Sequence, residues 1–142
     1  RLLGLWPDRD HPEPADLLAA DHESLRGVGL SGAKALAVVD LAAKIDSGEL
    51  CFDGIDDMCD EDVRTSLVRV RGIGPWSADM FMMFGLVRPD IFPLGDLGIR
   101  NGMHRLMQNS SATPPEMELR AEPWRPYRTF ASWYLWRSLS EK

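Results

Sequence analysis

The residues best placed for chemistry begin with a glycine-rich turn within residues 67–78. Gly72 and Gly74 flank Ile73, so the backbone is free to bend there and stays uncovered by side chains. Pro75 suits the first position of a following helix, where its missing N–H costs nothing. The amides of the turn and of the helix start then point outward as donors. This arrangement is typical of an anion site that binds a backbone phosphate, with Arg69 and Arg71 beside it. The motif alone favours the alternative, a plain helical hairpin whose glycines allow close packing.

Asp96 is the second candidate, because it follows Gly95 and precedes an apolar helix that we expect to begin at Leu97. An aspartate in this position is an ordinary N-cap. The helix start also favours the ionised form of its carboxylate. A capping role and a chemical role are therefore compatible, although the residue taken alone favours the cap.

The elements that must position these residues are all predicted to be helices, and we expect residues 1–13 to be irregular. Capping residues and apolar spacing predict helices over residues 14–20, 21–26, 31–48, 60–70, 75–86, 97–107, 115–121 and 127–139. Asp21, Ser31 and Asp60 are the expected N-caps. No useful β alternation occurs, so the predicted class is all-α.

The helix that begins at Pro75 is apolar nearly all round, which predicts a place in the middle of a domain. Its methionine and phenylalanine residues are expected in the core, and only Trp76 and Met80 are plausible pocket-lining residues. Core packing remains the alternative role for Trp76.

The length predicts one domain over residues 1–142, with the helical hairpin at 60–86. No apolar run approaches the ~18 residues that cross a bilayer, and no secretory signal is recognised. Cys51 and Cys59 are therefore expected to be reduced thiols, and the location to be intracellular, in the cytoplasm or nucleoid. The three histidines are too scattered to predict a metal centre, and no cofactor is expected.

The net charge of −6 argues against a nucleic-acid partner, but its distribution does not. Residues 1–63 carry 5 basic and 15 acidic side chains, whereas residues 64–105 carry 6 basic and 3 acidic ones. The last 23 residues are again locally basic. A local basic patch is what binds phosphate, so we expect modest DNA affinity with strong salt dependence.

Two motif blocks carry a resemblance to a known family. The stretch 67–78, followed by Phe92-Pro93-Leu94-Gly95-Asp96, resembles the helix-hairpin-helix DNA glycosylases, also called HhH-GPD proteins. The run 124–137, rich in Trp and Arg, and the segment 29–34 are similar to the alkylated-base branch, the 3-methyladenine DNA glycosylase II type. The likeness extends from about residue 21 to residue 139.

The resemblance implies an enzyme that removes alkylated purines from double-stranded DNA, acting as a monomer with no membrane association. It places Asp96 on the catalytic aspartate, where a fixed anion stabilises the positive charge that develops on the sugar. The base, flipped out of the duplex, is expected in a pocket formed by Trp76, Met80, Leu97 and Trp136. Met80 and Leu97 stand where one branch has aromatic residues, so the lesion preference stays open.

The phosphate-binding residues that the resemblance implies are Arg71, Gly72, Ile73, Gly74 and Ser77. Hairpins of this family also bind a monovalent cation through turn carbonyls, which makes such an ion possible here. Family members that cut the strand use a lysine at the position of Trp76. We therefore expect a monofunctional glycosylase that leaves an abasic site.

The family's N-terminal Gln-Gln-(Ile/Leu)-Ser type signature does not occur, so we expect a helix-hairpin-helix glycosylase domain without its N-terminal portion. This departure and the acidic excess of residues 1–63 leave a second hypothesis open, a non-catalytic helix-hairpin-helix DNA-binding module. A third hypothesis is a glycosylase for deaminated or oxidised bases.

Overall fold

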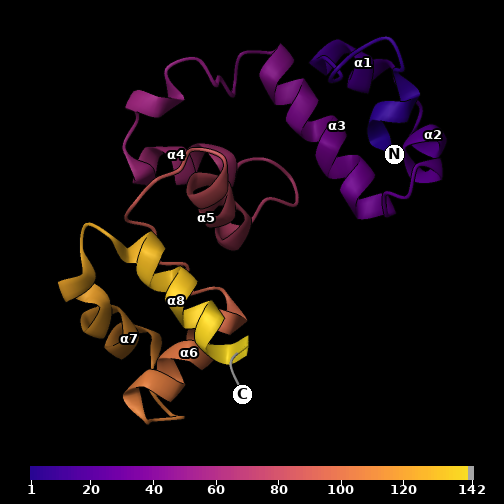
Figure 1. Cartoon of the computed structure of the whole chain (residues 1–142). Helices are drawn as coiled ribbons and strands as arrows, with labels where there is room; N and C mark the ends of the chain where they lie inside the picture. The colour runs from indigo at the N-terminus through magenta and orange to yellow at the C-terminus, as the bar shows by residue number, and fades with distance from the viewer. Residues whose placement is uncertain (141–142) are drawn as a thin grey trace. The chain divides into compact units, whose positions relative to one another are not determined.

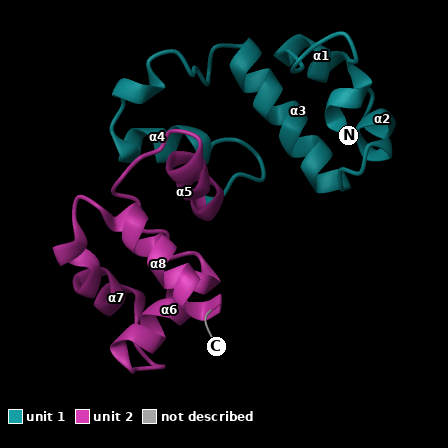
Figure 2. Ribbon diagram, viewed as in Figure 1, with its two compact units in different colours: residues 1–74 teal, residues 75–142 magenta. Residues whose placement is uncertain are grey.

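A computed structural model describes residues 1–140, which form helices joined by loops (Figure 1). No strand occurs among these residues, so the predicted all-α class is confirmed. The chain divides into two compact units, Arg1–Gly74 and Pro75–Lys142 (Figure 2). The assignment of the whole chain to one domain stays a prediction. No helix within the described part is long and apolar enough to cross a bilayer.

The first unit consists of short helices around one longer helix. Its α-helices are α1 (Pro14–Ala19), α2 (His22–Gly27), α3 (Gly32–Asp46) and α4 (Asp60–Leu67). Two 3₁₀ turns, η1 (Leu2–Leu5) and η2 (Ile55–Asp57), complete it. The turn η1 lies in the segment that we expected to be irregular.

The helix starts of the first unit follow local capping rules. The Asp21 side chain accepts a hydrogen bond from the Ser24 amide, and the Ser31 hydroxyl accepts one from the Lys34 amide, as predicted. The prediction that Asp60 caps α4 was wrong. Cys59 is the extended residue before the helix, and Asp60 is its first residue. The acidic first turn still faces the positive end of the helix dipole.

The buried side chains of the first unit come from its helices and from the loop that follows α3. On α4, Val63 and Leu67 are buried, as is Val70 just beyond it, which confirms the predicted apolar face. The other buried apolar side chains are Leu25, Ala35, Ala42, Leu50 and Ile55.

Over residues 75–140, the part that the structure describes, the second unit contains four α-helices and one 3₁₀ turn. They are α5 (Pro75–Phe84), α6 (Leu97–Met107), α7 (Pro114–Ala121), η3 (Glu122–Trp124) and α8 (Arg128–Ser140). Helix α8 packs along α6, as Figure 2 shows. Their contact surrounds an apolar cluster formed by Ile99, Met103, Ala112, Met117 and Leu135, with Trp124 and Trp136 packed against it.

Helix α5 ends earlier than predicted, at Phe84 rather than near Leu86. The amides of Gly85 and Leu86 both donate to the Phe81 carbonyl, and Val87 turns the chain with a φ of 52°. This left-handed residue closes the helix in the manner of a C-terminal cap.

The expectation that the Met and Phe residues of α5 lie in the core was wrong for Phe84. Met82 and Met83 are buried, but Phe84 is 57% exposed. Its ring stacks on Trp133 and Trp136 of α8, with centroid separations of 6.2 and 6.3 Å. Phe84 therefore contributes to an exposed aromatic surface. Helix α5 is apolar all round, but neighbouring segments do not cover it on every side, and Phe84 lies on an uncovered side.

A buried ion pair fixes the start of α8. Arg128 donates from Nε to Asp90 Oδ1 at 2.7 Å and from Nη2 to Asp90 Oδ2 at 2.9 Å. The neighbouring Thr129 hydroxyl donates to the Arg88 carbonyl and accepts from the Ile91 amide. The loop that leads toward α6 is therefore held against α8 by bonds across about 40 residues of sequence.

Replacing Asp90 by alanine is expected to lower the free energy of unfolding by about 3 kcal/mol, because it leaves the buried Arg128 charge without a partner. Glu122→Ala is the matched control, since its exposed pair with Arg125 contributes about 1 kcal/mol or less. Urea unfolding of both variants measures the difference. Equal losses would show that the Asp90 pair adds nothing beyond a surface contact.

The Asp90 pair also gives stability a pH dependence. Burial raises the pKa of Asp90, but the hydrogen bonds and charge of Arg128 outweigh this effect and leave the pKa below its ordinary value. A carboxyl whose pKa is lowered by folding stabilises the protein above its unfolded pKa. This contribution is lost as the pH falls through the folded value, in the range below pH 4.

Candidate functional site

The carboxylate of Asp96 lies at the start of α6, where three donors converge on it. Asp96 is the N-cap of this helix, and its Oδ1 accepts a hydrogen bond from the Ile99 amide at 2.9 Å. The indole N–H of Trp136 donates to the same oxygen at 2.7 Å. The indole N–H of Trp76 donates to Oδ2 at 2.9 Å. The predicted cap is confirmed, and α5, α6 and α8 all contribute to the site.

These donors decide the ionisation of Asp96. The side chain is half-buried, and burial raises the pKa of a carboxyl group. The hydrogen bonds from Trp136, the Ile99 amide and Trp76, with a smaller contribution from the Gly98 amide, outweigh burial, so the pKa of Asp96 lies below its ordinary value. The structure therefore holds an ionised carboxylate at neutral pH, surrounded by neutral donors.

The structure brings together two of the four residues predicted to form the base pocket. Trp76 and Trp136 both reach Asp96 through their indole N–H groups. Met80 is half-buried on α5, one turn after Trp76. Leu97 follows Asp96 directly but is 65% exposed, so it forms part of the surface rather than an enclosed wall.

The predicted phosphate-binding turn connects α4 to α5. The amide of Val70 donates to the Leu67 carbonyl, and the amide of Ile73 donates to the Val70 carbonyl. Gly72 has a φ of +79°, which confirms the need for glycine at this position. Gly74 does not share this conformation, and a Cβ added there would meet open space.

One residue of the turn has a partner that the sequence did not indicate. Asp40 on α3 accepts the Arg71 amide hydrogen at 2.8 Å, across 31 residues of sequence. A Cβ on Gly72 would lie 3.1 Å from the Ala37 Cβ, so α3 also approaches the turn closely there. The Arg71 amide is thus already used, and only its exposed side chain is free to reach an anion.

Ser77 and the start of α5 offer the remaining donors. The first amides of an α-helix have no partner within the helix, which applies to Trp76 and Ser77 here. Within the described residues, no group of three His, Cys, Asp or Glu side chains is placed to hold a metal ion. A monovalent cation at the turn carbonyls stays a prediction. Cys51 and Cys59 are free and exposed, in agreement with the expected thiols.

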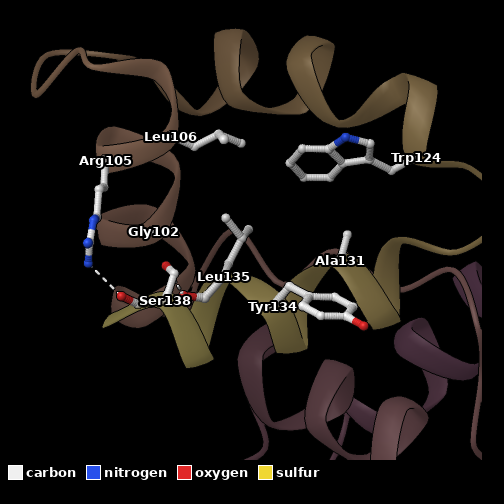
Figure 3. Close-up of a pocket in the computed structure, with 8 residues that line it drawn as sticks. All are labelled: Gly102, Arg105, Leu106, Trp124, Ala131, Tyr134, Leu135 and Ser138. Atoms are coloured by element: carbon white, nitrogen blue, oxygen red, sulfur yellow. Dashed lines mark hydrogen bonds between the residues drawn. The ribbon is translucent and has the colours of Figure 1, made fainter. Parts of the chain in front are cut away.

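A cavity of about 590 Å³ lies elsewhere in the second unit, between α6, η3 and α8 (Figure 3). Leu106 and Trp124 project into it from one side and Leu135 from the other. None of the residues predicted for chemistry lines it. This cavity is therefore separate from the Asp96 carboxylate.

Comparison with known proteins gives one family for most of the chain. Residues 2–126 match the family model described as HhH-GPD superfamily base excision DNA repair protein. The chain is 32% identical to DNA-3-methyladenine glycosylase 1 of Schizosaccharomyces pombe, over 97% of this chain and 61% of that protein.

Two solved structures are similar in fold. The crystal structure of a DNA-3-methyladenine glycosidase from Bacillus halodurans gives a TM-score of 0.85 at 31% identity, covering 97% of this chain and 64% of that one. The 3-methyladenine DNA glycosylase Mag1 of S. pombe, in complex with abasic DNA, gives 0.76 at 32% identity, covering 89% and 62%. The chain spans about half to two thirds of the length of the relatives that match nearly all of it.

Replacing Asp40 by alanine is expected to speed hydrogen exchange of the Arg71 amide about tenfold, because a hydrogen bond to a carboxylate contributes about 1.5 kcal/mol. Exchange followed by NMR measures the effect. Asp46→Ala, on the exposed end of the same helix, is the matched control. Unchanged protection of Arg71 in the Asp40 variant would contradict a role for Asp40 in holding the turn.

Proposed function

Because the chain belongs to the HhH-GPD superfamily of base excision DNA repair proteins, we propose that it hydrolyses the N-glycosidic bond of alkylated purines of the 3-methyladenine type in double-stranded DNA. Its relatives named as 3-methyladenine glycosylases support this substrate class. The observation that carries the proposal is the Asp96 carboxylate, held ionised at a helix start by three neutral donors.

A single carboxylate is sufficient for this reaction. As the bond between sugar and base breaks, positive charge develops on the sugar, and a fixed anion beside it stabilises the transition state. The same carboxylate is able to orient or deprotonate the attacking water. An alkylated purine is already cationic and leaves readily, so the site needs no strong general acid.

The other residues predicted for the site would bind the DNA strand and the flipped base. Turn amides at Gly72 and Gly74, with the side chain of Arg71, would hold a backbone phosphate of the DNA strand. The rings of Trp76 and Trp136, together with Met80 and Leu97, would border the extruded base. The complex of the related S. pombe enzyme with abasic DNA supports a duplex as the partner.

Asp96→Asn is expected to slow base release at least about 100-fold while duplex binding persists, because asparagine still caps α6 but carries no charge. Single-turnover release of 7-methylguanine and binding to abasic DNA measure the two effects. Asp21→Asn is the matched control, since Asp21 caps α2 in the first unit and is expected to leave release unchanged. Normal release by Asp96→Asn would reduce Asp96 to a cap and overturn its catalytic role. Duplex binding by the unaltered protein without any base release would favour the non-catalytic DNA-binding module.

Borohydride is expected to trap no covalent adduct between the protein and damaged DNA. The family resemblance implies that Trp76 stands where strand-cutting members carry a lysine, so we expect no amine there for a Schiff base. Denaturing gel electrophoresis after reduction measures the adduct, with Trp76→Lys as a comparison. An adduct formed by the unaltered protein would refute a purely hydrolytic reaction.

The lesion class is decided by direct comparison. Duplexes that carry a single alkylated, deaminated or oxidised base in the same sequence context are incubated with the protein under single-turnover conditions. Fastest release from the alkylated duplex supports the proposal. Fastest release from either of the others would assign the site to that lesion instead.

A further inference from the structure

The two oxygens of Asp96 are not equivalent. A carboxylate oxygen offers two acceptor sites. Oδ1 uses both, for Trp136 and for the Ile99 amide. Oδ2 accepts from Trp76 and, within the described part of the chain, has one acceptor site left. We propose that this remaining site of Oδ2 faces the reacting sugar, and that Trp76 and Trp136 are positioning residues that aim it. The inference rests on the proposed role of Asp96.

The carboxylate needs such restraint, because the last torsion of an aspartate side chain has only broad minima. The helix cap alone holds one oxygen and leaves the plane of the group free to turn. Trp136 and Trp76 add donors from α8 and α5, one to each oxygen. Three donors from three helices thus fix both the position and the plane of the carboxylate.

Trp136 is itself held rigidly. Its ring packs against the apolar cluster of the second unit. A Cβ on Gly98 would lie 2.7 Å from Trp136 Cδ1 and 3.0 Å from its Nε1. The indole therefore lies directly on the backbone of the first turn of α6, where no side chain has room. This close approach is what brings its N–H within 2.7 Å of Asp96 Oδ1.

Trp76 holds the other oxygen from the more open side. It is 48% exposed and follows the first residue of α5. A Cβ on Gly95 would be 3.6 Å from its Cβ, so the loop before Asp96 runs against it. An incoming nucleotide would meet this exposed ring, and the same side chain sets the direction of the free acceptor site on Oδ2.

Neutral donors suit this role better than a cation would. An arginine paired with Asp96 would fix the carboxylate equally well, as Arg128 does for Asp90, but would cancel the charge needed at the sugar. Indole N–H groups orient the carboxylate and leave its full negative charge in place. They also keep it ionised.

The test compares Trp136→Phe and Trp76→Phe, which keep a ring but lose the donor. Trp133→Phe is the matched control on α8, because its ring is half-exposed, contacts Phe84 and Phe130, and makes no bond to Asp96. We expect the Asp96 pKa, followed by carboxyl ¹³C NMR, to rise in both site variants and not in the control. Single-turnover base release should fall about tenfold or more, while abasic-DNA binding changes less than about threefold.

Gly98→Ala tests the same geometry without altering Trp or Asp. The added methyl group would lie 2.7 Å from Trp136 Cδ1 and 3.0 Å from Asp96 Oδ1, so it must disturb the bond between the indole and the carboxylate. Release should therefore fall about tenfold even though alanine favours the helix. Gly32→Ala in the first turn of α3, where a Cβ meets open space, is its control and should release base normally. A structure with DNA that carries a cationic pyrrolidine in place of the sugar should put the ring nitrogen nearer Oδ2 than Oδ1.

The outcomes separate the inference from the proposed function. If Asp96→Asn abolishes release but folded Trp76→Phe and Trp136→Phe release base at the normal rate, the positioning role is wrong and the function stands. An unchanged Asp96 pKa in both variants, or a pyrrolidine nitrogen nearer Oδ1, also overturns the inference. If Asp96→Asn releases base normally, the catalytic role of Asp96 fails and the inference fails with it. If the unaltered protein releases no base, the proposed function itself fails.

Discussion

The hydrogen bonds that converge on Asp96 are the interaction on which the second unit depends. They join the start of α5, the start of α6 and the middle of α8 through one carboxyl group. Each of these hydrogen bonds is common in proteins. Together they hold the Asp96 carboxylate where three chain segments meet. The apolar cluster behind Trp136 gives that arrangement its rigidity.

The remaining contacts of the second unit support this meeting point. The ion pair between Arg128 and Asp90, with the hydrogen bonds of Thr129, fixes the loop after α5 to the first turn of α8. That loop leads to Asp96, and that helix carries Trp136 about two turns later. The hydrogen bond between Trp136 and Asp96 joins α8 to the start of α6. The contacts of Asp90 and Thr129 join the same two parts of the chain a second time, several residues earlier in each.

Local features of this fold could be predicted from the sequence, and long-range side-chain contacts could not. Asp21, Ser31 and Asp96 cap their helices because capping depends on residues within one turn. The family resemblance located Asp96, Trp76 and Trp136 but did not predict that both indoles donate to the carboxylate. Those bonds cross 20 and 40 residues of sequence.

The other differences between the predictions and the structure also come from contacts that are distant in sequence. The bond between Asp40 and the Arg71 amide crosses 31 residues, and nothing in the local pattern of α3 indicates it. Phe84 was expected in the core because its helix is apolar all round. Periodicity does not say which side of such a helix lacks a neighbour, and here that side carries Phe84.

The close contact between Gly98 and Trp136 also limits how this site can change over time. A side chain at position 98 and an indole donor at position 136 exclude each other, because both need the same space. Position 98 therefore cannot gain a side chain while the Trp136 indole stays in place. A lineage that acquires a larger residue at the first must abandon the tryptophan at the second, and must find another way to steady its aspartate.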